Sequence, residues 1–366
     1  MNEREANALA AILEPLLTAL EALSLIARHL HPPHLSQLMA RAGTPDDALR
    51  DARAQHLSAL SGMAELAALI DASCGHVLMA YEKLRSVASG DGDLRDVYQA
   101  LGHVPDALET LYPLAGLLPV VNRFFIDPTL RGDEALQASL MGGDRSDRTG
   151  LMQIGGRANG APDDRDAVHI YVPENAVSGQ PLPLVMALHG GSGSGRRFIW
   201  SWVRAARSVG AIVVAPSSAG TTWSLSGDDY DTPRILDVLE FVRGMWNVDS
   251  SRTLLTGMSD GGTFAYLSGL SAGSPFTHLA PVSAAFHPML MAFAEPDRVR
   301  GLPITVVHGE LDWMFPVSMA LEASEALHRA GARVRFRRLA DLSHTYPGEI
   351  NIGILDWLMR EGNDDA

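Results

Sequence analysis

The stretch that decides the fold reads RTLLTGMSDGGTFAYL and spans residues 252–267. Its opening residues, 252–255, form a short apolar and β-branched run, which indicates a buried strand. The pattern from Thr263 onward is that of a helix. Between strand and helix, the spacing Gly-x-Ser-x-Gly places Ser259 at the apex of a tight turn. This order of elements is typical of a nucleophile elbow.

Such a turn needs small neighbours on either side of the serine. Gly257 and Gly261 remove the two Cβ atoms that would collide where the backbone passes close by. The Ser259 hydroxyl would then project from the carboxyl end of the sheet, above the positive end of a helix. The alternative interpretation is an ordinary glycine-rich turn between a strand and a helix.

Composition describes a globular chain with a sizeable core. The chain has 366 residues, of which 46% are hydrophobic and 20% charged, and its net charge is −14. This charge argues against nucleic acid or an anionic membrane as the main partner. Cys74 is the single cysteine, so no internal disulfide forms, and we expect it to be a small buried hydrophobic residue. With charged residues interrupting the N-terminal apolar run, we expect a cytoplasmic protein without a membrane span.

Residues 1–130 have apolar positions at helical spacing and predict a helical N-terminal domain. This domain either covers the active site or forms an oligomer surface, and the alternative is a separately packed accessory bundle. Loop-forming residues at 131–150 predict a linker, and 151–366 a catalytic domain. His31 and His34 flank two prolines. They are metal ligands in principle, but a polar turn is the preferred interpretation, and no metal is expected.

From residue 183 onward the pattern alternates between strand and helix, which predicts a largely parallel sheet in an α/β domain. Two preceding strands, within 151–154 and 167–172, are expected to pair antiparallel. Further strands are predicted at 184–188, 211–215, 252–255, 277–286, 304–308 and 334–339. Helices are predicted at 198–209, 233–246 and 348–360.

A serine nucleophile needs a base and a group that orients that base. Asp312 follows the strand at 304–308 and is the favoured acid, with Glu310 as its rival. His344 follows the last strand and is the favoured base, because nucleophile, acid and base then occur in the order Ser, Asp, His. His278, His287 and His308 are weaker candidates for the base, and His308 is expected to be structural.

The developing oxyanion needs backbone donors. One is expected from Asp260, directly after the nucleophile, and the other from the loop HGGSGSG at 189–195. Gly191 is the favoured second donor and Ser192 the next. This loop also admits a dinucleotide-binding interpretation, but the spacing G-x-G-x-G and the absence of an acid after the strand at 211–215 disfavour it.

Taken together, the loop at 189–191, the elbow, the motif His-Gly-x-x-Asp-x-x-x-Pro at 308–316 and His344 resemble the α/β-hydrolase fold. More narrowly, residues 150–362 resemble the phospholipase/carboxylesterase and polyhydroxybutyrate-depolymerase-like group. The resemblance implies Ser259 as nucleophile, His344 as base and Asp312 as its orienting acid. The helical region does not occur in that group's usual core, and the connection that often carries a cap is short here.

The expected activity is hydrolysis of small or aromatic carboxylic esters through an acyl-enzyme, with no cofactor. A peptidase or thioesterase with the same triad is the first alternative. A non-catalytic binding protein on the same fold is the second. Side chains predicted to line a substrate pocket are Trp223, Trp313, Met314 and Phe315.

Overall fold

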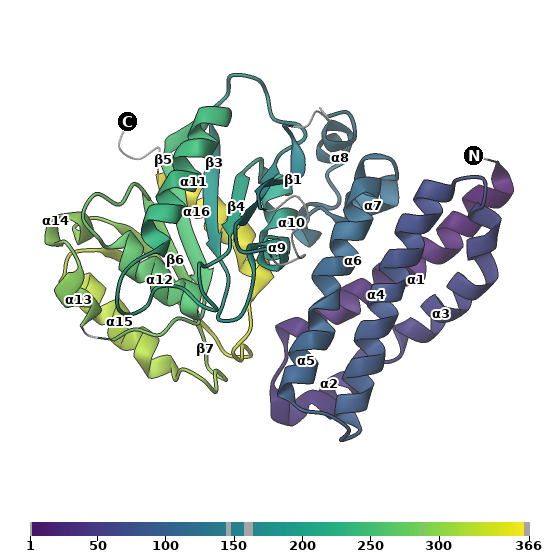
Figure 1. Cartoon of the computed structure of the whole chain (residues 1–366), viewed down its shortest axis with the longest axis horizontal. Coiled ribbons are helices and arrows are strands. Elements are labelled where there is room, and N and C mark those ends of the chain that lie inside the picture. Colours follow the sequence, from purple (N-terminus) through teal and green to yellow (C-terminus); the bar gives the residue numbers. More distant parts are fainter. Residues whose placement is uncertain (1, 144–147, 157–163, 288, 362–366) are drawn as a thin grey trace. The chain divides into compact units, whose positions relative to one another are not determined.

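The structure, a computed structural model, describes residues 2–143, 148–156, 164–287 and 289–361. The chain forms two compact units, Met1–Met141 and Gly142–Ala366 (Figure 1). The boundary lies inside the range 131–150 that the sequence predicts as a linker, of which 144–147 lie outside the described residues. Helix α8 (Glu134–Met141), the last helix of the first unit, lies within that range, so part of the range is regular structure.

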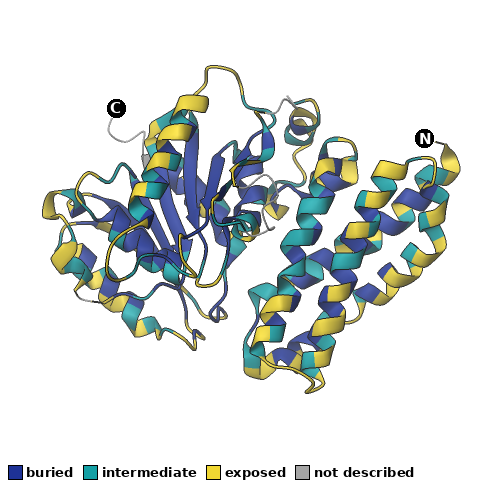
Figure 2. Ribbon diagram, viewed as in Figure 1, coloured by how far each residue is buried: buried dark blue, intermediate teal, exposed yellow. Residues whose placement is uncertain are grey.

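The first unit is helical throughout its described residues. Its long helices, α1 and α4, are amphipathic, and Figure 2 shows their buried stripes. The hydroxyl of Tyr81 on α4 donates to the Ala19 carbonyl of α1 at 3.2 Å, within a core where both residues are fully buried. Its remaining α-helices are shorter. The bounds are α1 (Glu3–Arg28), α2 (Leu35–Ala42), α3 (Pro45–His56), α4 (Ala64–Ala88), α5 (Leu94–Leu101), α6 (His103–Leu111) and α7 (Pro119–Phe124), with 3-10 turns η1 (Pro32–His34), η2 (Leu57–Leu60), η3 (Tyr112–Gly116) and η4 (Pro128–Leu130).

Helix boundaries in this unit follow local capping chemistry. Pro45 begins α3, as its position after Thr44 predicts. The turn between η2 and α4 contains Gly62, whereas Gly75 lies inside α4. Pro105 does not break a helix, because it occupies the first turn of α6, where its missing N–H has no intrahelical partner to lose.

One helix among the described residues, α1, is long and apolar enough to cross a membrane by length and composition alone. The same helix has buried positions at helical spacing, including Ile12, Leu16 and Leu20, all fully enclosed in the helical unit. A core helix of a globular unit meets the same criterion.

The second unit is built on an eight-stranded sheet with the order β1-β2-β4-β3-β5-β6-β7-β8. The β1–β2 and β2–β4 pairs are antiparallel and the others are parallel, which confirms the predicted mostly parallel α/β domain. The strands are β1 (Gly150–Gly155), β2 (Ala167–Val172), β3 (Leu182–Leu188), β4 (Ile212–Pro216), β5 (Val248–Met258), β6 (His278–Val282), β7 (Pro303–Gly309) and β8 (Arg333–Leu339).

Helices cover both faces of the sheet (Figure 1). Alternate residues of β3 and β4, such as Met186 and Val214, join a core with α11 (Asp231–Met245), α12 (Asp260–Gly269) and α15 (Val317–Arg329). The intervening residues face the other side, where α10 (Trp200–Val209) packs against α16 (Asn351–Glu361). Short helices α9 (Gly195–Phe198), α13 (Leu290–Phe293) and α14 (Pro296–Val299) lie in the connections.

Because β3, β5, β7 and β8 are parallel, their carboxyl ends lie at one edge of the sheet. The loops that follow these ends carry the glycine-rich segment, the elbow serine and the predicted acid and base. Ligands and reacting groups are commonly placed at this edge in open α/β sheets.

Candidate active site

Ser259 lies between the end of β5 and the start of α12 with a left-handed φ of 54°. Its N–H donates to the Val282 carbonyl at 2.9 Å, which holds the strained turn against β6. A Cβ on Gly257 would lie 2.4 Å from the backbone of Gly261. One on Gly261 would lie 2.4 Å from the carbonyl oxygens of Leu188 and His189. The close approach predicted at both glycines is therefore present.

The structure brings Ser259, His344 and Asp312 together. The Ser259 hydroxyl lies 3.0 Å from Nε2 of His344, and Nδ1 of His344 lies 2.9 Å from Oδ2 of Asp312. All three residues are buried, with 6–9% of their surface exposed. With the Nδ1 hydrogen donated to the carboxylate, Nε2 is the acceptor for the serine hydroxyl hydrogen. This geometry connects a nucleophile, a base and an orienting acid.

The Asp312 carboxylate is prepared to remain ionised. Its Oδ1 accepts the backbone N–H groups of Met314 and Phe315, each at 2.9 Å, while Oδ2 faces His344. Burial opposes ionisation, but hydrogen bonds from His344 and from the Phe315 N–H outweigh it, so the pKa of Asp312 lies below its ordinary value. A second imidazole, that of His308, lies 3.4 Å from Oδ2.

The rival candidates occupy other positions. Glu310 pairs with Arg338 at 2.6 Å near the surface. His308 has its Nε2 2.9 Å from the Phe315 carbonyl, so it supports the acid's loop, as its structural interpretation predicts. His278 begins β6, at the opposite end of the strand from the elbow, and packs edge-on against Trp357. His287 is exposed and its Nδ1 accepts the Met289 N–H.

Gly191 and Asp260 are the two residues predicted to supply backbone donors for the oxyanion. The Cβ position of Gly191 lies 2.6 Å from Oδ2 of Asp260, so these two residues are neighbours. Within the described residues, neither backbone N–H is donated to another part of the chain. The prediction that the Ser192 N–H is a further donor to the oxyanion is wrong. Its N–H donates to the Thr221 carbonyl at 2.8 Å, and its φ is 59°, so this group is already used to fold the loop.

Side chains behind the glycine loop hold it in place, and the sequence alone did not identify their role. Trp223, predicted to line the pocket, is instead a core residue with 2% of its surface exposed. Its indole N–H donates to the His189 carbonyl at 2.7 Å, and its ring stacks on Phe264. Thr222 donates to the Asp260 carboxylate at 2.5 Å. The Trp223 prediction failed because an indole that reaches a buried acceptor packs inside.

The remaining predicted pocket residues lie on the loop between Asp312 and α15. The Phe315 ring meets the His344 ring edge-on, with centroids 5.4 Å apart. Trp313 lies 6.4 Å from the same imidazole, also edge-on. Trp313 and Met314 are 45% and 47% exposed, so their apolar surfaces are available beside the base. This loop supplies both the acid and an apolar surface.

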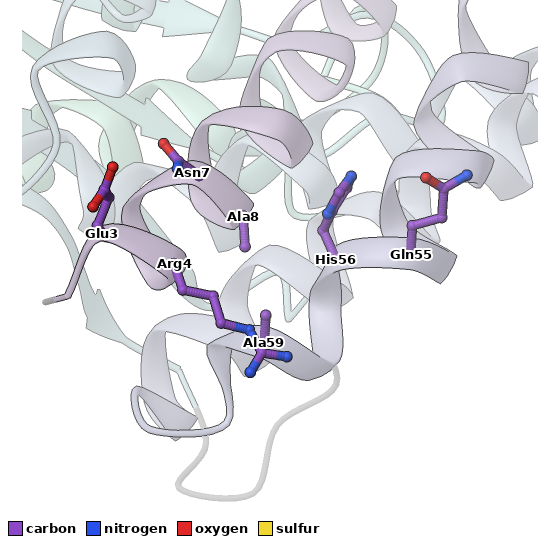
Figure 3. A pocket seen from close by; sticks show the side chains of 7 residues that line it. All are labelled: Glu3, Arg4, Asn7, Ala8, Gln55, His56 and Ala59. Atoms are coloured by element: carbon purple, nitrogen blue, oxygen red, sulfur yellow. The ribbon is translucent and has the colours of Figure 1, made fainter.

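A pocket of about 480 Å³ opens in the helical unit (Figure 3). Its wall is formed by α1, with Glu3, Arg4 and Asn7, and by the end of α3, with Gln55 and His56. These side chains are a carboxylate, a guanidinium, two amides and an imidazole, and the wall contains no nucleophile paired with a base. It offers no competing hydrolytic centre.

Part of the second unit is similar to known proteins. A family model described as Phospholipase/Carboxylesterase matches residues 236–355, a range that includes Ser259, Asp312 and His344. A curated relative is the bifunctional acetylxylan esterase/xylanase XynS20E of Neocallimastix patriciarum. It is 29% identical over 149 residues, which cover 40% of this chain and 21% of the relative. The chain thus spans about a fifth of the length of that relative.

Solved structures with a similar arrangement include a thermostable esterase, with 20% identity, a TM-score of 0.46 and coverage of 57% of this chain and 62% of that one. Another is an S-formylglutathione hydrolase from Staphylococcus aureus, with 16% identity and a TM-score of 0.45. The match covers 59% of this chain and 100% of that one. The sheet order, the elbow and the family match lead to one conclusion. The second unit has an α/β-hydrolase fold, and residues 236–355 within it are similar to the phospholipase/carboxylesterase family.

Proposed function

We propose that this protein is a serine carboxylesterase that hydrolyses small or aromatic esters through an acyl-enzyme on Ser259. The observation that carries the proposal is the continuous contact from the Ser259 hydroxyl through His344 to Asp312. An isolated serine hydroxyl is a weak nucleophile, and a neighbouring base oriented by a carboxylate is the arrangement that activates it.

In the proposed reaction, Ser259 Oγ attacks the ester carbonyl carbon while Nε2 of His344 takes the hydroxyl proton. The N–H groups of Gly191 and Asp260 stabilise the oxyanion of the tetrahedral intermediate. The intermediate collapses as the imidazolium gives its proton to the leaving alcohol. Water, deprotonated by the same imidazole, then attacks the acyl-enzyme and releases the carboxylic acid. Asp312 stays ionised and stabilises the imidazolium in both steps.

The surroundings of His344 support the proposed substrate class. Trp313, Met314 and Phe315 present apolar and aromatic surface beside the base, which suits an acyl or aryl group. The relative's name includes acetylxylan esterase, so acetyl esters, including acetylated sugars, belong in the first substrate panel. We therefore propose neutral esters with short or aromatic acyl groups.

The decisive experiment compares wild type with Ser259→Ala on a chain-length series of nitrophenyl esters. We expect turnover to fall by roughly 10⁴ to 10⁶. Ser271→Ala is the matched control, because this serine follows the other end of α12 and its hydroxyl donates to the Ser268 carbonyl. Near-full activity of Ser259→Ala would remove the mechanism.

Two other functions remain in competition. A peptidase or thioesterase would use the same triad, and a panel of matched ester, thioester and peptide substrates separates these activities. A non-catalytic binding protein on this fold is distinguished by a fluorophosphonate probe, which labels Ser259 only if the serine is activated. We expect labelling of wild type and no labelling of Ser259→Ala.

The role of the helical unit and the cytoplasmic location stay predictions. A chain that begins at Gly142, the first residue of the second unit, tests the former. If the helical unit is a cover or an oligomer surface, its removal changes ester selectivity or the assembly state. Unchanged selectivity and assembly would favour a separately packed accessory unit.

A further inference from the structure

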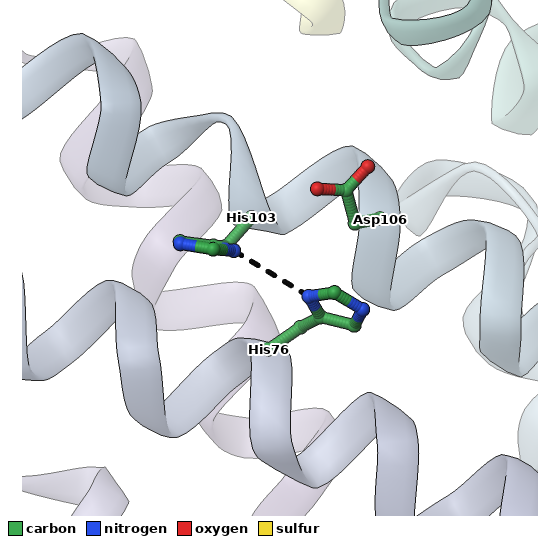
Figure 4. Close-up of side chains that lie close together, drawn as sticks. All are labelled: His76, His103 and Asp106. Atoms are coloured by element: carbon green, nitrogen blue, oxygen red, sulfur yellow. Dashed lines mark hydrogen bonds between the residues drawn. The ribbon is translucent and has the colours of Figure 1, made fainter. Parts of the chain in front are cut away.

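Two histidines and an aspartate gather on facing helices of the first unit (Figure 4). His76 lies on α4, and His103 and Asp106 lie on α6. One potential ligand atom from each of the three residues lies within 4.8 Å of the other two. All three residues are half-buried, so the cluster borders on solvent.

The positions of these side chains are fixed by the two helices. His103 and Asp106 are three residues apart on α6, a spacing that places both on one face of a helix. Helix α4 is fastened to α6 one turn away from His76, because the buried Ser73 hydroxyl donates to the Ala107 carbonyl at 3.1 Å. The cluster is therefore held by ordered backbone on both sides.

The two imidazoles face each other through the same type of nitrogen. Nδ1 of His76 lies 3.4 Å from Nδ1 of His103. This distance is long for a nitrogen–nitrogen hydrogen bond, and at most one hydrogen fits between the two atoms. It matches the ligand-to-ligand edge of a tetrahedral zinc site, which is about 3.3 Å for metal–nitrogen bonds of about 2.05 Å.

We propose that His76, His103 and Asp106 bind a divalent transition-metal ion of the Zn²⁺ class. Two imidazole nitrogens and one carboxylate oxygen form a borderline donor set that suits Zn²⁺, Co²⁺ or Ni²⁺ rather than Mg²⁺ or Ca²⁺. A carboxylate oxygen of Asp106 already lies within 4.8 Å of a ring nitrogen of each histidine. Since the cluster borders on solvent, water completes the coordination. The ion joins α4 to α6.

The neighbouring histidine pair offers a comparison. His31 and His34 have ring centroids 4.9 Å apart and belong to the short turn η1. Among the described residues, no third ligating side chain joins them in a group of this kind. Their interpretation as a polar turn stays a prediction, and we assign the ion to the α4–α6 cluster instead.

The test uses the full chain without an affinity tag. Metal-free protein is titrated with Zn²⁺ by calorimetry, and with Co²⁺ by visible absorption, which reports the coordination geometry. We expect one ion per chain at the cluster and a tetrahedral Co²⁺ spectrum. Saturating Zn²⁺ should raise the unfolding midpoint of the helical unit by about 5 °C.

Variants assign the ion to its ligands. His76→Gln, His103→Gln and Asp106→Asn keep the size of each side chain, and each should weaken binding on the order of 100-fold. His34→Gln is the matched control and should bind like wild type. Because Asp106→Asn changes only one atom, its unchanged circular dichroism separates a lost ligand from a lost fold.

Two results overturn the proposal. One is the absence of stoichiometric Zn²⁺ binding to the wild type. The other is binding that survives in all three ligand variants, which would place the ion elsewhere on the chain. Neither result depends on ester hydrolysis, because the readouts are binding, absorption and unfolding.

Discussion

The backbone N–H of Ser218 donates a hydrogen bond to Nε2 of His189 at 3.0 Å. The other ring nitrogen, Nδ1, lies 2.7 Å from the Gly190 carbonyl and carries the ring's hydrogen. The imidazole is therefore neutral, and it ties the start of the glycine loop to the segment after β4. Burial is the largest effect on this group and lowers the pKa of His189 to about 4.

This relationship predicts a pH dependence of stability. In the unfolded chain the pKa of His189 is near 6.5, so between pH 6.5 and 4 the unfolded state binds a proton that the native state does not. The stabilisation is complete above pH 6.5 and is lost as the pH falls to about 4, a change of about 3 kcal/mol. Urea unfolding of wild type and His189→Gln across this range measures it.

His34→Gln is the control for this measurement, because His34 is an exposed residue of the helical unit. The wild type and the control should lose unfolding free energy more steeply than His189→Gln does. Parallel pH dependences for all three proteins would contradict a neutral, buried His189.

Asp312→Asn should lower kcat by roughly 10³ to 10⁴ with a smaller effect on KM. The Met314 and Phe315 N–H groups both donate to Oδ1, so the carbonyl oxygen of the new amide takes that place. The amide nitrogen then faces His344 as a donor. Nδ1 must become an acceptor, which moves the ring hydrogen to Nε2 and removes the base that Ser259 needs.

Steady-state kinetics on a nitrophenyl ester measure this effect. Glu310→Gln is the matched control, since this carboxylate pairs with Arg338 near the surface. We expect the control to keep wild-type turnover within a factor of about three, consistent with the small contribution of surface ion pairs. Turnover of Asp312→Asn within tenfold of wild type would exclude the proposed role of the carboxylate.

The inner strands of the second unit, such as β3, β4 and β7, were predictable because their residues are enclosed on both faces. Such strands read as continuous apolar runs, and β3 and β4 lie close to their predicted positions. The strand predicted at 277–286 is shorter, His278–Val282, because Ser283 adopts a φ of 45° and turns the chain. A conformation imposed by tertiary contacts leaves no local signal in the sequence.

The site was predictable to the same degree. Ser259, Asp312 and His344 each follow a strand end, and parallel strands bring those ends together. Ser192 was misjudged as a donor because its N–H is taken by Thr221, 29 positions along the chain. The α4–α6 cluster of His76, His103 and Asp106 was missed because its residues lie on two helices. The three-residue spacing of His103 and Asp106 was the one local sign that two of them share a helix face.

Gly261→Ala should destabilise the second unit by about 3 kcal/mol. The added Cβ would lie 2.4 Å from two backbone carbonyl oxygens, those of Leu188 and His189, which cannot rotate away as a side chain does. Gly244→Ala is the matched control in α11, where no atom lies within 4 Å of the new Cβ. We expect the control to gain about 0.5 to 1 kcal/mol from helix propensity. Thermal unfolding measures both, and equal stability of the two variants would contradict the close packing of the elbow.

The last prediction concerns the helical unit, where Arg85 of α4 reaches Asp46 of α3. Both guanidinium nitrogens Nη1 and Nη2 donate to the carboxylate, the first at 2.6 Å, and the Asp46 side chain is fully buried. Asp46 also lies in the first turn of α3, where a negative charge is favourable. The Arg85 side chain is 36% exposed and water can solvate it after the change, so the cost comes from the charge-assisted hydrogen bonds of the buried carboxylate and should be about 2 kcal/mol in Asp46→Ala.

A second ion pair between the same two helices provides the comparison. Arg53 of α3 lies 2.6 Å from Asp71 of α4, and their side chains are 34% and 40% exposed. Water competes for these charges, so Asp71→Ala should cost less than about 1 kcal/mol. Urea unfolding of both variants, followed by helical circular dichroism, measures the difference. Since distance and helix pair are shared, a larger loss in Asp71→Ala than in Asp46→Ala would show that burial does not set the strength of these bridges.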